Sequence, residues 1–137
     1  MTDGNMQTLS AVVSIRNEEY RLAACLECLS FADELVVVLD RCTDNSEDIA
    51  RAHGAIIHEG GWELEGDRRN AAILACSSEW ILEVDADEHV PPDLAVEIRE
   101  TVNTTPFDWH EIPVDNYIGD QLVRYGWGAS YGKAAYP

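Results

Sequence analysis

Three carboxylates stand within four residues in the segment Asp85-Ala86-Asp87-Glu88, directly after the apolar run Trp80–Val84. Carboxylates this close repel one another, so at least one of their pKa values should rise unless a cation lies among them. Because side chains alternate along an extended chain, Asp85 and Asp87 share one side if the strand continues through Ala86. Two carboxylates there suit Mg²⁺ or Mn²⁺, which keep positions open for water and substrate phosphates. A solvated acidic turn is the alternative, because the chain holds 26 Asp and Glu residues.

Further polar side chains follow other apolar runs. Arg16 and Glu18 come after "AVVSI", and Asp40 comes after "ELVVVL". Asp40 could accept hydrogen bonds from a base or a ribose, or it could be a loop or cap carboxylate. Arg69, beside Arg68, is expected in the first turn of a helix, where the helix dipole does not favour positive charge. Arg69 therefore has either a phosphate-facing role or a salt bridge to one of the many acids.

The spacing of apolar residues predicts strands that alternate with helices. Nearly continuous apolar runs in the strands indicate a parallel sheet covered on both faces, and right-handed crossovers make it doubly wound. Ligands of such sheets bind outside the carboxyl ends of the strands, where the polar residues above gather. This placement favours the cation site over the solvated turn. The predicted strands cover residues 9–15, 34–39, 55–59 and 79–84, and the predicted helices cover 17–29, 44–53, 68–76 and 91–102.

Three residues mark helix ends in this prediction. Asn17 is expected to cap the first helix. Asp44, with Glu47 three residues later, is expected to form a capping box that opens the second helix. Gly54 is expected to close that second helix.

Composition limits the classes of protein. A chain of 137 residues, 46% of them hydrophobic, suffices for one folded domain. The net charge of -17 disfavours nucleic acids and anionic membrane surfaces, since both need basic residues. The sequence shows no signal peptide and no apolar stretch of about 20 residues that could span a bilayer. A cytoplasmic protein is therefore expected.

Cys25 and Cys28 form a C-x-x-C pair, which is compatible with a zinc or redox site. They also fit an amphipathic helix in which Leu22, Cys25, Leu26 and Leu29 share one face. No second C-x-x-C or histidine pair is present to complete a tetrahedral zinc site. Small buried thiols are therefore the favoured interpretation.

The sequence after Val102 is rich in aromatic residues and glycine and has no helical period. It predicts strands and loops, and it includes Trp109 and Trp127. The chain stops at Pro137 without a terminal element, so we expect residues 1–137 to form a single, incomplete domain.

Four ordered segments, "AVVSIRNEE", "ELVVVLDRCTDNSEDIA", "GDRRNAAI" and "WILEVDADEHVPPDL", resemble family 2 glycosyltransferases. The likeness is greatest to the lipopolysaccharide-core β-glucosyltransferase-like group, and it is strong over residues 9–99. The resemblance implies the GT-A fold, a Rossmann-like, mostly parallel sheet with helices on both faces. It also implies metal-assisted transfer of a sugar, with inversion, from a nucleotide donor, usually a UDP-sugar, to a hydroxyl of a glycan or glycolipid.

The resemblance also implies roles for the residues that follow the strands. Arg16 and Glu18 would lie near the nucleoside, Asp40 on the base and Arg69 near the uracil or phosphates. Asp85 would approach the ribose and the metal. Asp87 would ligate the metal, Mg²⁺ or Mn²⁺, that bridges the diphosphate.

The sequence departs from the family pattern in two places. The loop "DRCTD" has Arg41 and Cys42 where the family has a different pair, so the resemblance does not establish how the base is recognised here. None of Glu111, Asp115 and Asp120 matches the family's general base, which we expect beyond Pro137. A non-catalytic nucleotide-sugar binding module, an inactive fragment and a phosphotransferase or hydrolase of the D-x-D type remain alternatives. Peripheral membrane association remains open for a full-length protein.

Overall fold

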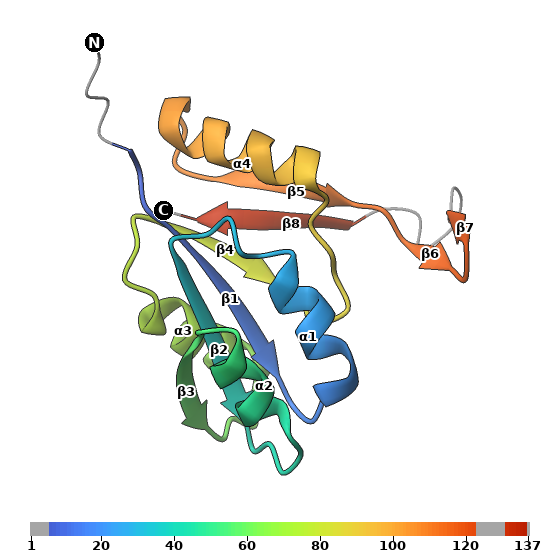
Figure 1. The fold of residues 1–137 in the computed structure, drawn as a ribbon. Helices are drawn as coiled ribbons and strands as arrows, with labels where there is room; N and C mark the ends of the chain where they lie inside the picture. The colour runs from blue at the N-terminus through green and yellow to red at the C-terminus, as the bar shows by residue number, and fades with distance from the viewer. Residues whose placement is uncertain (1–5, 123–130, 137) are drawn as a thin grey trace.

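The computed structural model describes residues 6–122 and the backbone of residues 131–136. Strands and helices alternate along most of the chain (Figure 1). The elements are β1 (Leu9–Ile15), α1 (Glu19–Glu27), β2 (Glu34–Asp40), α2 (Ser46–Ala52), β3 (Ile56–Gly60), α3 (Glu65–Ala75), β4 (Trp80–Val84), α4 (Pro92–Thr104), β5 (His110–Val114), β6 (Tyr117–Ile118), β7 (Gln121–Leu122) and β8 (Tyr131–Tyr136).

The main sheet has six strands in the order β3-β2-β1-β4-β8-β5. Strands β1 to β4 are parallel, whereas β8 runs antiparallel between β4 and β5. The chain winds outward from β1 through β2 to β3, and then crosses back to place β4 on the other side of β1. The topological switch point therefore lies between β1 and β4, where open α/β sheets bind their ligands. Strands β6 and β7 form a separate hairpin that projects from the sheet (Figure 1).

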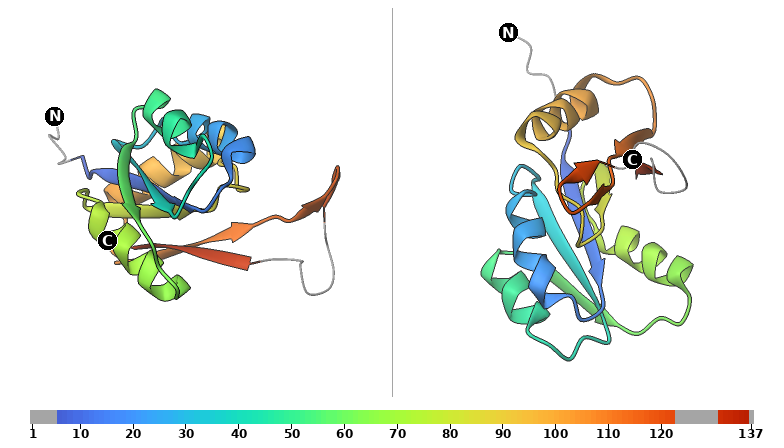
Figure 2. Two further views of the ribbon diagram at one scale, coloured as in Figure 1. Left: turned by 90° about the horizontal axis from the view of Figure 1, so that it is seen from below. Right: turned by 90° about the vertical axis from the view of Figure 1, so that its right-hand side faces the viewer.

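Helices cover both faces of the sheet (Figure 2). On one face, α1, α2 and α4 bury an apolar cluster that includes Leu22, Leu26 and Ile98 against Val13 and Leu82 of the strands. On the other face, α3 covers a smaller cluster of Val12, Val36, Val38, Ala72 and Ile81. The doubly covered, mostly parallel sheet that the apolar runs predict is confirmed.

Two predicted helix caps are wrong. Asn17 does not cap α1, because its backbone takes a positive φ of 52° and its side chain bonds to the loop after β2 instead. The capping box of Asp44 and Glu47 does not form, because Asn45 holds the N-cap position of α2. Gly54 does follow the end of that helix, as predicted, and its backbone has a positive φ of 74°.

Helix α3 begins three residues earlier than the sequence predicts, at Glu65 instead of Arg68. Gly66 suggests a loop, yet it is accommodated in the first turn, where Glu65 and Asp67 suit the positive end of the helix dipole. Arg69 therefore lies in the second turn, four residues after Glu65. The prediction that Arg69 lies in the first turn of the helix is wrong.

The segment after α4 forms strands and loops, as predicted, over the residues that the structure describes. Trp109 is exposed just before β5, whereas Trp127 lies outside the described residues. None of the helices within residues 6–122 is long and apolar enough to cross a membrane.

Candidate functional site

The predicted site residues occupy one edge of the sheet, at the carboxyl ends of the parallel strands. Strand β1 leads into Arg16 and Glu18, β2 ends at Asp40, and β4 leads into Asp85 and Asp87. Parallel pairing of β1 with both β2 and β4 brings these ends together, as the sequence predicts.

Helix α1 adds a residue that the sequence did not single out. Nη1 of Arg21 lies 3.9 Å from a carboxylate oxygen of Glu18 and 3.9 Å from one of Asp87. Arg21 therefore links the first turn of α1 to the acidic segment after β4, across the switch point. Its position three residues after Glu18 places both on one helix face, which is the signal that could have identified it.

The acidic segment is a closed turn and not an extended chain. The amide of Glu88 donates to the carbonyl of Asp85 at 2.9 Å, and the amide of Asp85 donates to the Glu88 carboxylate at 2.9 Å. Ala86 is 2% exposed in the core, while Asp85 and Asp87 on either side of it are exposed. The prediction of continued strand alternation is therefore wrong. The turn nevertheless presents both aspartates to solvent, and Glu88 closes it.

The C-x-x-C pair at the C-terminal end of α1 contacts this turn through hydrogen bonds of both cysteines. The thiol of Cys25 donates to the carbonyl of Asp85 at 3.6 Å, and the amide of Val90 donates to the sulfur of Cys28 at 3.3 Å. Both cysteines are free, and burial, followed by the neighbouring Cys28 and acidic charges, raises the pKa of Cys25 to about 12. The interpretation as small buried thiols therefore holds for Cys25, an inert and protonated thiol, whereas Cys28 is only half-buried. The pair positions the acidic turn.

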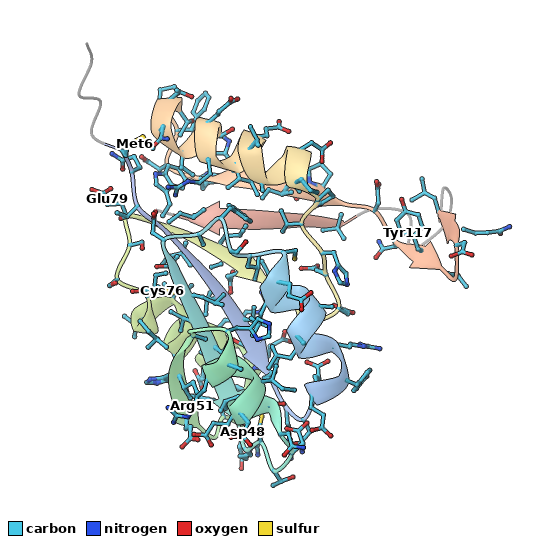
Figure 3. The ribbon with its side chains drawn as sticks, viewed as in Figure 1. Met6, Asp48, Arg51, Cys76, Glu79 and Tyr117 are labelled. Atoms are coloured by element: carbon cyan, nitrogen blue, oxygen red, sulfur yellow. The ribbon has the colours of Figure 1, made fainter. Side chains whose placement is uncertain are left out.

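Replacement of Cys28 by alanine is expected to loosen the turn, because the Val90 amide loses its acceptor. The cost in unfolding free energy should be about 1 kcal/mol. Hydrogen exchange should show faster exchange of the Val90 amide in Cys28→Ala and protection restored in Cys28→Ser. Cys76→Ala, at the end of α3 (Figure 3), is the matched control and should leave that amide unchanged. Equal exchange in wild type and Cys28→Ala would contradict this role.

Asp40 is almost completely enclosed, with a side chain that is 4% exposed. Its Oδ1 accepts from Nε of Arg41 at 2.8 Å and from the Trp62 amide at 3.3 Å, and its Oδ2 faces Nη1 of Arg68 at 3.5 Å. Burial raises the pKa of this carboxyl, but the bonds from Arg41 and Trp62 outweigh burial and hold it below its usual range. Asp40 is therefore an ionised anchor with its acceptors occupied.

The loops after β1 and β2 are joined by side-chain hydrogen bonds. Oδ1 of Asn17 accepts from the amides of Thr43 at 2.7 Å and Asp44 at 3.3 Å. In return, the Asp44 carboxylate accepts from the Glu19 amide at 3.1 Å, and the Glu19 carboxylate accepts from the Asn45 amide at 2.9 Å. These bonds fix the positions of Arg16 and Arg41, which flank the joined loops.

The sequence left Arg69 with two options, a phosphate contact or a salt bridge to an acidic residue. In the structure Arg69 forms salt bridges. Its Nη2 lies 3.0 Å from Glu65 of the same helix, and its Nη1 lies 3.9 Å from Glu83 of β4. The hydrogen bond that Arg69 donates to the Glu65 carboxylate raises the pKa of Arg69 further. Arg16, in contrast, is exposed and has no ion pair with any residue in the described part of the chain.

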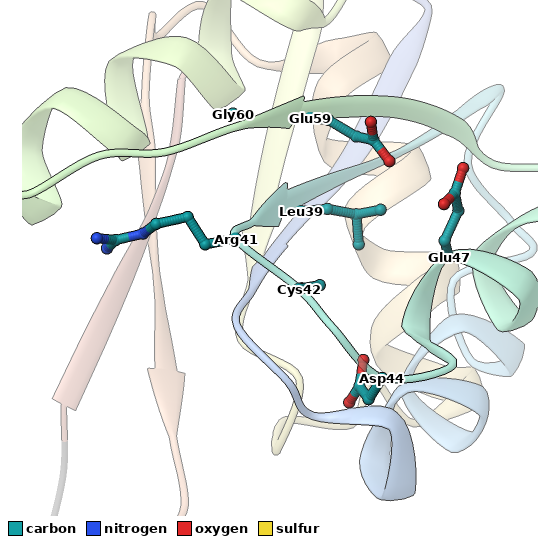
Figure 4. A pocket seen from close by; sticks show the side chains of 7 residues that line it. All are labelled: Leu39, Arg41, Cys42, Asp44, Glu47, Glu59 and Gly60. Atoms are coloured by element: carbon teal, nitrogen blue, oxygen red, sulfur yellow. The ribbon is translucent and has the colours of Figure 1, made fainter.

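A pocket of about 250 Å³ lies beside the carboxyl ends of β2 and β3 (Figure 4). The pocket is lined by three carboxylates together with four other residues: Asp44, Glu47, Glu59, Leu39, Arg41, Cys42 and Gly60. The side chain of Arg41 extends away from the three carboxylates. Three carboxylates would repel a diphosphate. The charge of this pocket therefore disfavours a diphosphate there.

The donor set at the acidic turn fits Mg²⁺ or Mn²⁺. Two exposed carboxylates without histidine or thiolate are the hard oxygen ligands that these ions prefer. No group of three or more possible metal ligands is assembled within the described residues. Two protein carboxylates agree with the usual Mg²⁺ arrangement, in which water and substrate phosphates complete the shell.

Relatives of this chain carry the same type of domain. It is 31% identical over 95 residues to an uncharacterised glycosyltransferase of Rickettsia typhi, matching 69% of this chain and 32% of that protein. It is 24% identical over 133 residues to the lipopolysaccharide core biosynthesis glycosyltransferase LpsC of Rhizobium meliloti, matching 90% of this chain and 44% of that protein. The chain thus spans about a third to less than half of the length of these curated relatives.

A solved structure has the same fold. Glucosyl-3-phosphoglycerate synthase from Mycobacterium tuberculosis, in complex with Mn²⁺ and UDP-glucose, superposes with a TM-score of 0.63 at 23% identity. The alignment covers 75% of this chain and 42% of that chain. The fold is therefore the GT-A fold. The sequence profile of glycosyl transferase family 2 matches residues 10–125, which is most of the chain, and the chain belongs to that family.

Proposed function

We propose that this chain is the donor-binding part of a metal-dependent glycosyltransferase that uses a nucleotide-sugar, with a UDP-sugar as the donor. The observation that carries this proposal is the closed turn after β4, which presents Asp85 and Asp87 beside the switch point of the sheet. The Mn²⁺ and UDP-glucose in the structurally similar mycobacterial enzyme support a donor of this class.

The negative charge of the chain explains why donor binding would need a metal ion. At a net charge of -17, the protein repels a nucleoside diphosphate unless a cation stands between them. Asp85 and Asp87 would hold Mg²⁺ or Mn²⁺, which when bound offsets the charge that builds on the diphosphate leaving group. Arg16, exposed after β1, and Glu18 would face the nucleoside. Arg69 would reach the phosphates only by leaving its ion pair with Glu65.

The transfer is proposed to proceed with inversion to a hydroxyl of a glycan or glycolipid. Similarity to a lipopolysaccharide core biosynthesis enzyme supports a lipopolysaccharide-type acceptor. An inverting transfer needs a base that deprotonates the acceptor hydroxyl. We assign that role to no residue of this chain, so donor binding and sugar transfer require separate tests.

Calorimetric titration with UDP and UDP-glucose, with and without Mn²⁺, tests donor binding. Wild type should bind both in the presence of Mn²⁺, and Asp87→Asn should weaken that binding by at least about tenfold, because one metal ligand is lost. Asp48→Asn is the matched control, since Asp48 is exposed on α2 (Figure 3). Absence of binding by wild type, or unchanged binding by Asp87→Asn, would contradict the proposal. Sugar transfer to a glycolipid acceptor would distinguish an enzyme from a non-catalytic binding module.

A further inference from the structure

The family resemblance assigns Asp40 to the contact with the nucleotide base. In this structure a base cannot reach the Asp40 carboxylate. Its side chain is 4% exposed. Oδ1 already accepts from Arg41 at 2.8 Å and from the Trp62 amide at 3.3 Å, while Oδ2 faces Arg68 at 3.5 Å. A nucleobase would have to displace an arginine from a buried carboxylate in order to reach it.

Arg41 lies over Asp40 and is held in place from several directions. Nε donates to Asp40, and Nη2 donates to the Trp62 carbonyl at 2.8 Å. The backbone of Arg41 has a positive φ of 51°, which is uncommon for a residue with a side chain. Its aliphatic stem packs against Gly61, where an added Cβ would come within 3.2 Å of Cγ and Cδ of Arg41. The guanidinium is therefore pre-organised.

The outer part of this guanidinium remains available to a ligand. The side chain of Arg41 is 43% exposed, in contrast to the enclosed carboxylate of Asp40. Within the described residues, Nη1 of Arg41 donates to no acceptor, whereas Nε and Nη2 are both engaged. The two N–H groups of Nη1 thus stand at the carboxyl end of β2, where the family resemblance implies that the base lies.

We propose that Arg41, and not Asp40, contacts the nucleotide base, and that it selects bases with a carbonyl group at C4 of a pyrimidine or C6 of a purine. A guanidinium only donates hydrogen bonds and cannot lose its charge, so it needs an acceptor opposite it. Uracil and guanine present a carbonyl oxygen at the position where cytosine and adenine present an amino group. An amino group would place donor against donor. Asp40 then acts through Arg41 as a positioning residue. This inference rests on the proposed nucleotide-sugar function.

Titration of wild type with UDP, GDP, CDP and ADP, each with Mn²⁺, tests this selection. UDP and GDP should bind about tenfold more tightly than CDP and ADP, the effect of one donor facing an acceptor instead of a donor. Arg41→Gln should bring the four affinities to within about twofold, because its amide offers both a donor and an acceptor. Arg51→Ala, at an exposed arginine of α2 (Figure 3), should keep the wild-type preference.

The outcomes separate this inference from the proposed function. Mn²⁺-dependent binding of all four nucleotides with equal affinity by wild type would overturn the selection by Arg41 and leave the donor site intact. A preference that survives in Arg41→Gln would also overturn it. Failure of every nucleotide to bind would overturn the proposed function itself. A thermal melt of Arg41→Gln accompanies the titration, and if that variant unfolds, the wild-type comparison of UDP with CDP decides.

Discussion

Replacement of Leu26 by alanine is expected to lower the free energy of unfolding by about 2–5 kcal/mol. Leu26 is 1% exposed and belongs to the larger apolar cluster beneath α1. Its loss removes buried methyl groups and leaves a cavity that close-packed neighbours can fill only in part. Urea unfolding followed by circular dichroism measures the change.

The same substitution at Leu74 is the matched control. Leu74 also lies on a helix, α3, but it is 84% exposed. Leu74→Ala should therefore change stability by no more than about 0.5 kcal/mol. Similar losses for Leu26→Ala and Leu74→Ala would show that α1 is not packed on the sheet as described.

Replacement of Asp40 by asparagine is expected to cost about 2 kcal/mol at neutral pH. The neutral amide keeps the shape of the side chain but removes the charge that faces Arg41 and Arg68. The cost should fall below the range for a fully buried ion pair, because both arginines remain partly exposed. Asp108→Asn, in an exposed loop, serves as the control and should have little effect.

The dependence of this cost on pH follows from the lowered pKa of Asp40. Burial opposes ionisation, but the bonds from Arg41 and Trp62 make the folded-state pKa lower than that of the unfolded chain, which is about 3.9. The ionised carboxylate therefore contributes stability above the unfolded-state value, and that contribution is lost as pH falls through the folded-state value. The difference between wild type and Asp40→Asn should be large at pH 7 and should shrink in acid. If wild type and Asp40→Asn differ in stability at low pH as much as at pH 7, the lost charge is not the cause of the difference.

The fold was predictable because the strands are buried on both faces. Runs such as Val36, Val37 and Val38 are apolar throughout, which only a covered parallel strand requires, and β2 lies where those residues are. The edge of the sheet that carries the site was also predictable. Asp40, Asp85 and the end of β1 lie at the carboxyl ends of parallel strands, where such sheets bind their ligands.

The details of the site were less predictable because they depend on contacts between segments far apart in sequence. Asn17 looked like a local cap, but its acceptor is used by Thr43 and Asp44, 26 and 27 residues away. Asp40 looked like an open acceptor, but its carboxylate accepts from the Trp62 amide and faces Arg68, 22 and 28 residues away. In each case a polar side chain had a local and a distant option, and sequence spacing informs only the local one.

The place of β8 in the sheet affects how the protein folds during synthesis. Residues Tyr131–Tyr136 form a strand that pairs with β4 on one side and β5 on the other. Until these residues leave the ribosome, β4 has an unpaired edge and β5 has no partner in the main sheet. Exposed edges of this kind invite pairing with other chains. The nascent chain is therefore expected to be most prone to aggregation after β4 has formed and before β8 is available.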